Sequence, residues 1–487
     1  MGETLVIVDS ISDLTLKCAE QIGFDGATLS LGTQAEHQIR MGRAAFENLT
    51  ALGEKDYIYG VTTQPGGRAK QVADEALQRR QGASLSSFIA MDFGFSDSLL
   101  PERTARMIAL ARLSNALTGR SRLTFETAKA IADILDGPIP AVPLASATGP
   151  GEVIPLSWFL SPLASLPLKD GEAMSLINGS PCSTAMVCEA AIASRRIFDV
   201  LLDLSGLMIE AARAPLMHYD RRLSDLSQDQ DYRHVLARLE QVLDGAEPSG
   251  RLAHQATVSW RIIPNILATS LKATRIAEEV AETSLQSVND NPAMVGRLDD
   301  PQDLAMVSAG GFHAAAASRA IDQINAALAD LTVLLSKQTA RLVDGHPFGF
   351  PPYLCPSDAY GVGGEYLAWL QSGASERARH AAAPATLSPG LEDPDGGQSD
   401  VSATTFLAYE RNMHARDALY SAMSTAIATA ELAMKIHGQS AAPDVERFRA
   451  RFDPIAGYAD GLATMGQSLR SAKCRLRSWI EGGSGEA

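Results

Sequence analysis

The second half of the chain contains a long stretch whose apolar residues recur at helical spacing. Between Asp400 and His437 there is neither glycine nor proline, and Gly438 follows directly. This pattern predicts a single helix of about 55 Å, at about 1.5 Å per residue, that stops at the glycine. The apolar positions that define it are Phe406, Leu419, Met423, Ile427, Leu432 and Ile436.

Three other segments have the same Ala- and Leu-rich character, with few helix breakers: 183–204, 266–285 and 312–343. Long helices that are apolar on much of their circumference need neighbours on several sides. We therefore predict a mainly α fold with a long central helical bundle that continues across subunits, in a homotetramer.

Glycine and proline are dense over residues 137–167 and 345–397. Frequent glycine and proline residues are typical of loops between helices. We place a mixed, loop-rich N-terminal part with a lid and active-site region in residues 1–200. The long-helix bundle domain is expected in residues 201–487.

Charge and composition narrow the class of protein. The chain has 42 Lys and Arg against 57 Asp and Glu, a net charge of −15 that repels a phosphate backbone. Its five cysteines form no CxxC pair, and no stretch of about 18 apolar residues or secretory leader is visible. We expect a cytoplasmic protein with reduced thiols and neither nucleic-acid nor membrane partners.

The common cofactor motifs are missing from the sequence. The nine histidines include no pair at i and i+4, and there is no Walker loop or GxSxG elbow. The run Gly361-Val362-Gly363-Gly364 lacks the strand-then-helix context of a dinucleotide site. We expect no metal and no nucleotide cofactor.

Three loop residues offer chemistry instead. Tyr59 precedes a glycine-rich turn, where its phenol either acts as a general base on a lid or serves as a structural hydrogen-bond donor. Asn178 can offer its amide to a substrate, although Ser180 and Ser183 beside it also read as helix caps. Arg261 lies among apolar residues, so it is expected to meet a carboxylate, either of a substrate or of the protein.

Five short polar segments are spread over the whole chain, and two of them contain Tyr59 and Asn178. In chain order they are Tyr59-Gly60-Val61-Thr62-Thr63, Asn178-Gly179-Ser180, Asn289-Asp290-Asn291-Pro292, Gly311-Phe312-His313 and Gln398-Ser399-Asp400-Val401-Ser402. Together they resemble motifs of the histidine and phenylalanine ammonia-lyase family. The resemblance implies a mostly helical homotetramer with active sites built from three subunits. It also implies that Tyr59 is catalytic, and that the substrate is a small carboxylate bound by Asn178, Arg261, Phe312 and Gln398.

The electrophile of that family is a methylidene-imidazolone ring, formed from Ala-Ser-Gly just before Asp-Leu-Ala-Pro-Leu. Here Glu152-Val153-Ile154-Pro155-Leu156 stands in the second position and Gly149-Pro150-Gly151 in the first, so there is no serine to dehydrate. The resemblance thus implies that no ring cofactor forms. A shifted alignment, which uses Ala147-Thr148-Gly149 to make a methylated ring, stays open.

Without the ring, the elimination has to be an easier one. Ammonia is a poor leaving group and the Cβ proton of an amino acid is barely acidic, so a leaving group such as a quaternary amine is favoured. In this respect the chain is similar to the ergothioneine trimethylammonia-lyases. It departs from the wider family at Val258, where a second tyrosine is usual, and it has no lysine near Gly363-Gly364-Glu365.

Three hypotheses follow. The first is a ring-independent carbon–nitrogen lyase acting on an amino acid or amino-acid betaine. The second is a conventional ammonia-lyase or aminomutase with the shifted ring. The third is a homologue without catalytic activity that serves as a scaffold.

Overall fold

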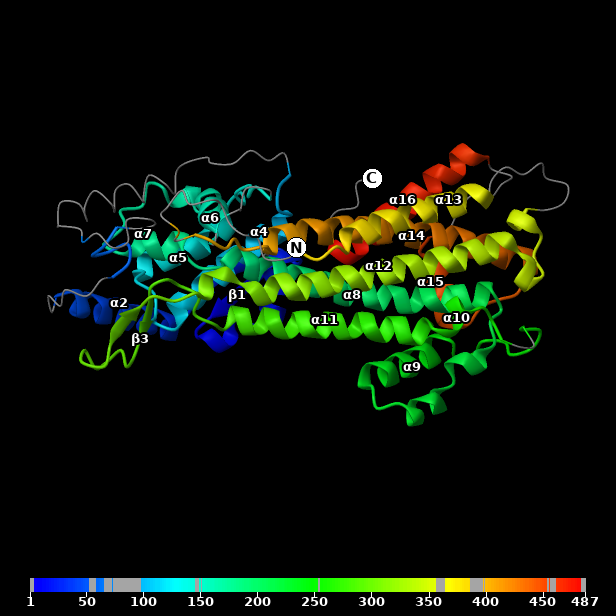
Figure 1. Ribbon diagram of the computed structural model, residues 1–487, viewed down its shortest axis with the longest axis horizontal. Coiled ribbons are helices and arrows are strands. Elements are labelled where there is room, and N and C mark those ends of the chain that lie inside the picture. The colour runs from blue at the N-terminus through cyan, green and yellow to red at the C-terminus, as the bar shows by residue number, and fades with distance from the viewer. Residues whose placement is uncertain are drawn as a thin grey trace. The chain divides into compact units, whose positions relative to one another are not determined.

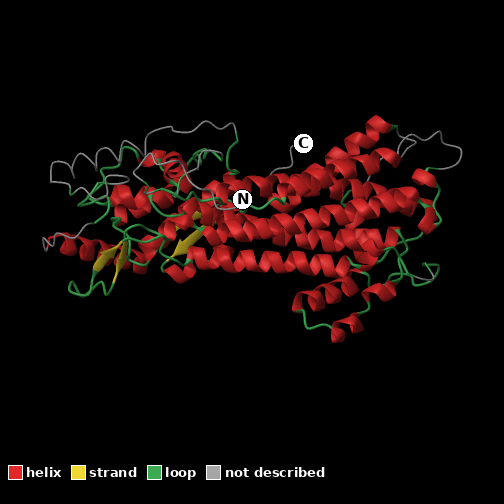
Figure 2. Ribbon diagram, in the orientation of Figure 1, coloured by secondary structure: helices red, strands yellow, loops and turns green. Residues whose placement is uncertain are grey.

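The computed structural model describes residues 4–51, 58–64, 72, 98–144, 149, 151–252, 255–355, 364–385, 397, 399–452, 455 and 461–482. Helices dominate these residues, and strands are few and short (Figure 2). The prediction of a mainly α fold is therefore confirmed. Within the described ranges, no helix has the length and apolar character needed to cross a membrane.

The four predicted long helices are all present (Figure 1). Their bounds are Pro181–Ala211 (α8), Ile263–Leu285 (α11), Ala315–Asp344 (α12) and Thr405–His437 (α14). The helix α14 ends as its sequence predicts: Gly438 has a φ of +64° and donates its N–H to the carbonyl of Met434 at 2.9 Å.

The chain divides into two compact units, each built from three separate segments. Four of the five points where the chain passes from one unit to the other fall within the four long helices, and the fifth lies between Ala383 and Pro384. The expected boundary near residue 200 lies within α8. The first unit holds Met1–Ile192, Ala277–Ile321 and Pro384–Glu410. The second unit holds Ala193–Ile276, Asp322–Ala383 and Arg411–Ala487.

The first unit combines short helices with two small sheets. The strands β1 (Leu5–Val8) and β2 (Thr28–Leu31) pair in parallel, whereas β3 (Ala293–Val295) and β4 (Ala305–Val307) form an antiparallel pair. Its short helices are Leu16–Gly23 (α1), Thr33–Ala51 (α2), Glu102–Leu117 (α4), Phe125–Asp133 (α5), Val153–Phe159 (α6) and Glu172–Ile177 (α7).

A small apolar cluster joins α2 to the strand pair in the first unit. Phe46 of α2 packs there with Met294 and Leu304, and Val61 adds a half-buried side chain. Because Val61 is two residues after Tyr59, this cluster fixes the position of the Tyr59 turn beside the strand pair.

The second unit contains, besides its parts of the long helices, Gln230–Val242 (α9), Val258–Arg261 (α10), Gly364–Ala381 (α13), Pro443–Ala450 (α15) and Leu462–Glu481 (α16). Trp260 anchors the short helix α10, since its side chain is fully buried. Its indole N–H donates to the carbonyl of Met208 at 3.0 Å, and its own carbonyl accepts from the hydroxyl of Tyr219 at 2.9 Å. These bonds fix the backbone from which Arg261 extends.

Candidate active site

Tyr59 lies in a compact turn whose backbone is held by one residue. The carbonyl of Ile58 accepts the N–H groups of Val61, Thr62 and Thr63 at 3.0 to 3.2 Å, and the N–H of Ile58 donates to the Thr62 hydroxyl at 2.8 Å. Tyr59 itself is half-buried. The turn thus presents the phenol from a fixed backbone, which is what a positioned general base requires.

Gly60 brings this turn close to helix α7. Its φ is +68°, and a Cβ atom at this position would collide with Cε of Met174. Met174 also lies beside Asn178, whose amide nitrogen is 3.8 Å from the methionine sulfur. Met174 therefore connects the Tyr59 turn to the candidate substrate-binding asparagine.

Asn178 directly follows α7 and is held by its neighbours. Its amide nitrogen donates to the carbonyl of Asn291 at 2.5 Å, and its side-chain oxygen accepts the N–H of Gly179 at 2.9 Å. Its backbone carbonyl accepts from Nη1 of Arg112. The second N–H of the amide donates to the sulfur of Met174. The side-chain oxygen has two lone pairs and accepts one hydrogen bond here, so it can still accept one from a ligand.

Arg112 carries a positive charge into the interior of the first unit. It is 1% exposed, and its Nε has no hydrogen-bond partner among the described residues. Burial lowers the pKa of Arg112, while the nearby carboxylates of Asp290 and Glu152 raise it. Arg112 was not among the predicted site residues, although it is a single arginine within the apolar run 109–113, the same pattern that indicated Arg261.

The segment aligned with the ring-forming triad is attached to the first unit at both ends. The carbonyl of Gly149 accepts the N–H of Ala403 at 3.1 Å. At the other end, the two oxygens of buried Glu152 accept the N–H groups of Cys182 and Ser183 at 2.6 and 2.7 Å. Glu152 therefore caps helix α8, a role for which the sequence offered Ser180 or Ser183.

Glu152 is buried and has no cation among its hydrogen-bond partners, and this changes the pKa of its carboxyl group. Burial raises its pKa to about 7, although hydrogen bonds from Ser183 and Cys182 partly offset this. Its carboxyl group is therefore poised between its two protonation states near neutral pH.

Phe312 lies next to the same helix end. It belongs to the short 3₁₀ helix η7 (Gly311–His313) and is half-buried. The hydroxyl of Ser180 donates to the carbonyl of Gly311 at 3.2 Å, and Nε2 of His313 is buried without a hydrogen-bond partner in the described structure. The structure thus brings the motifs at residues 59, 178, 290 and 312 into one unit.

Arg261 lies in the second unit, at the end of α10. Its Nε is buried and has no hydrogen-bond partner in the described part of the chain, and no described carboxylate forms an ion pair with it. Burial and the guanidinium of Arg261 lower the pKa of His218, so this cation lies close to the imidazole. Val258, at the start of the same helix, is 56% exposed.

Several predicted residues lie outside the described residues: Tyr57, Ala147, Thr148, Pro150 and Gln398. Among the residues that are described, no group of three or more His, Cys, Asp or Glu side chains is arranged to hold a metal ion.

Comparison with known proteins identifies related chains. The family model described as aromatic amino acid lyase matches residues 14–166 and 160–453. The histidine ammonia-lyase of Vibrio cholerae is 24% identical over an alignment of 429 residues, and the match covers 81% of this chain and 81% of that protein. The histidine ammonia-lyase of Geobacillus thermodenitrificans is 25% identical over an alignment of 416 residues, and the match covers 78% of this chain and 80% of that protein.

Solved structures show the same fold. The crystal structure of ergothionase from Treponema denticola, an ergothioneine-degrading enzyme, matches with a TM-score of 0.86 and 16% identity, covering 98% of this chain and 99% of that one. The phenylalanine aminomutase of Pantoea agglomerans matches with a TM-score of 0.83 and 19% identity, covering 97% and 98%. At these identities the likeness concerns the fold.

Proposed function

The chain belongs to the aromatic amino acid lyase family, and we propose that within this family it is a carbon–nitrogen lyase that works without a methylidene-imidazolone ring. Its substrate is a small carboxylate, an α-amino acid or amino-acid betaine. The group that leaves is a better leaving group than ammonia, such as trimethylamine.

One observation carries this proposal. The three residues before Glu152 are Gly149-Pro150-Gly151, which contain no hydroxyl to dehydrate. Glu152 is itself fixed on helix α8 through Cys182 and Ser183, which supports the alignment of the glycines with the ring position. In this alignment the residues present do not fit the ring, which supports a reaction that runs without it.

The remaining groups support a base-promoted elimination. Tyr59, as phenolate, takes the proton from the substrate Cβ, and the electron pair of that bond forms the Cα–Cβ double bond. The Cα–N bond breaks with its electrons on nitrogen, so a quaternary ammonium leaves as a neutral amine. Arg261 binds the carboxylate through its planar fork, while Asn178, Phe312 and Gln398 orient the rest of the substrate.

The matching structures are compatible with this choice of leaving group. Among them is ergothionase, whose substrate ergothioneine is a betaine. The same lyase fold thus serves a betaine in one neighbour and amino acids in others.

The decisive experiment combines mass and activity. We expect the intact protein to have the mass of its sequence, with no absorbance from a ring chromophore. We then expect a screen of amino-acid betaines and α-amino acids to give a new conjugated-acid absorbance with a betaine. A mass short by two waters overturns the ring-free mechanism.

A conventional ammonia-lyase remains the second candidate, because the sequence relatives named above are histidine ammonia-lyases. It requires the ring to form from Ala147-Thr148-Gly149. The same mass measurement distinguishes the two, and release of ammonia from histidine would favour this second candidate directly.

We also propose that the active enzyme is a homotetramer. Several large apolar side chains are exposed on the single chain, among them Tyr366, Trp369 and Leu370 of α13 at 41, 63 and 51%. Exposed apolar surface of this kind marks interaction sites. Light scattering at micromolar protein should give four times the chain mass of 51.7 kDa, and a monomeric mass would contradict the proposal.

A further inference from the structure

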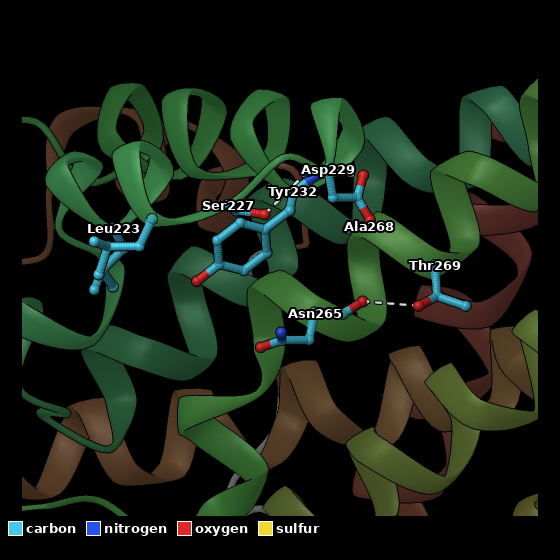
Figure 3. A pocket seen from close by; sticks show the side chains of 8 residues that line it. Leu223, Ser227, Asp229, Tyr232, Asn265, Ala268 and Thr269 are labelled. Carbon is cyan, nitrogen blue, oxygen red and sulfur yellow. Dashed lines mark hydrogen bonds between the residues drawn. The ribbon is translucent and has the colours of Figure 1, made fainter.

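A concave site with a volume of about 400 Å³ lies in the second unit, beside the first part of α11. One wall comes from the 3₁₀ helix η6 (Arg221–Leu226) and the start of α9, and the other from α11 (Figure 3). Leu223, Leu226 and Ala268 give it apolar surface, and Asp229, Tyr232 and Asn265 contribute polar side chains.

Asp229 uses only one of its two oxygens within the protein. It is the N-cap of α9, and its Oδ1 accepts the N–H groups of Asp231 and Tyr232 at 2.9 and 3.4 Å. Its Oδ2 has no hydrogen bond or ion pair in the described structure. The N-terminus of α9 carries a partial positive charge of roughly half a unit, which is smaller than the full negative charge of the Asp229 carboxylate. The surface around Asp229 therefore remains negative.

Two more polar groups at the site are also unused. Neither the hydroxyl of Tyr232 nor the side-chain amide of Asn265 bonds to any described residue, and both line the same pocket as Asp229 (Figure 3). The Tyr232 ring is half-buried, and burial raises the pKa of its hydroxyl. The ring is therefore neutral at physiological pH and offers a π face.

Among the described residues that line the pocket, none carries a positive charge that could neutralise Asp229. Two arginines on the helices that form the walls have partners elsewhere: Nε of Arg233 donates to the carbonyls of Ser224 and Ser227 at 3.2 and 2.8 Å, and Arg275 pairs with Asp231 at 2.5 Å. Asp229 is thus the single charged side chain among the lining residues.

We propose that this pocket binds a small alkylammonium ion, held by the Asp229 carboxylate and the face of the Tyr232 ring. A carboxylate and an aromatic face are the two groups that attract organic cations, and the apolar residues Leu223 and Ala268 suit alkyl substituents. The amine expected to leave in the proposed reaction belongs to this class, but binding at this pocket does not depend on that reaction.

The test is a titration of the full-length protein with tetramethylammonium chloride, followed by calorimetry, with sodium chloride at equal ionic strength as the reference. No turnover is measured, so the result is separate from the proposed lyase activity. A heat of binding that saturates as tetramethylammonium is added supports the site. The absence of saturable binding up to tens of millimolar overturns it.

Matched variants locate the binding. Asp229→Asn removes the charge but keeps a good helix cap, so the protein should fold and bind about tenfold more weakly. Asp225→Asn removes the same charge four residues earlier, from an exposed residue that does not line the pocket, and should leave the affinity unchanged. Equal affinity in wild type and Asp229→Asn overturns the assignment.

Variants of Tyr232 separate the ring from its hydroxyl. We expect Tyr232→Phe to retain binding, because the π face remains, and Tyr232→Leu to weaken it about fivefold. If Tyr232→Phe loses binding as fully as Tyr232→Leu, the hydroxyl is the recognised group and the proposal of a cation site is wrong.

Discussion

Asp290 and Arg122 form an ion pair that is withdrawn from solvent. Nη2 of Arg122 lies 3.2 Å from both carboxylate oxygens of Asp290. The side chain of Arg122 is 1% exposed and that of Asp290 is 0% exposed. The Ser175 hydroxyl also donates to the carboxylate at 3.0 Å, and Nη1 of Arg122 donates to the carbonyl of Pro292 at 3.0 Å. The pair thereby joins α7, which ends at the candidate substrate-binding Asn178, to the segment before β3.

Breaking this pair should cost much of the stability of the first unit. Asp290→Asn leaves the buried charge of Arg122 without compensation, which we expect to lower the free energy of unfolding by about 3–5 kcal/mol in denaturant titrations. Asp299→Asn is the matched control, since Asp299 pairs with Arg297 while both are about 70% exposed. That control should cost less than about 1 kcal/mol, and equal losses in the two variants would contradict the argument.

A second prediction concerns Gly60. Gly60→Ala adds a Cβ in a left-handed backbone conformation and against Met174, so we expect a loss of about 2–4 kcal/mol and reduced activity. Gly26→Ala is the control: its φ is +73°, yet nothing lies within 4 Å of the added Cβ. Gly26→Ala should therefore show only the backbone part, about 1–2 kcal/mol. If Gly60→Ala and Gly26→Ala lower the free energy of unfolding equally, the contact with Met174 does not contribute to the loss.

The long helices were predictable because their signals are local. The run 400–437 carries its own apolar spacing, and Gly438 supplies its end. The same holds for α8, α11 and α12, whose predicted spans lie close to the observed ones.

The supports of the candidate site were not predictable in this way, because they join distant segments. Arg112 bonds to Asn178, 66 residues away, and Arg122 pairs with Asp290, 168 residues away. Neither spacing follows from periodicity. The cap on α8 was likewise assigned to a nearby serine, since nothing in the sequence indicates that Glu152 reaches it from 30 residues earlier.

A third prediction uses the titration of Glu152. Its pKa is raised from 4.5 to about 7 in the folded protein, so the folded state binds more protons than the unfolded chain between these values. The contribution of Glu152 to the free energy of unfolding is therefore largest below about pH 4.5. This contribution, about 3 kcal/mol, is lost as the pH rises through 7.

Glu152→Gln tests this sign. The amide cannot ionise, so the stability of wild type relative to Glu152→Gln should fall between pH 5 and pH 8, measured as thermal midpoints at constant ionic strength. A difference that is constant over this range would show that Glu152 keeps one protonation state.

A fourth prediction concerns Arg261. Arg261→Lys keeps the charge but loses the two-pronged fork, so we expect kcat/KM to fall by about 10- to 100-fold, or roughly 1.5–3 kcal/mol of transition-state binding. Arg221→Lys, at a cation that is 68% exposed, is the control. Unchanged turnover in a folded Arg261→Lys protein would assign this arginine a structural role.

The last prediction concerns the base. A phenol with a reference pKa near 10 is a weak base at neutral pH, and a positioned general base contributes about 10²–10⁴-fold to the rate. Tyr59→Phe keeps the half-buried ring and removes only the hydroxyl. We therefore expect kcat to fall at least about a hundredfold with assembly intact. Tyr57→Phe, two residues earlier, should retain activity. The opposite pattern would move the base from Tyr59 to Tyr57 and refute the role assigned to the Tyr59 turn.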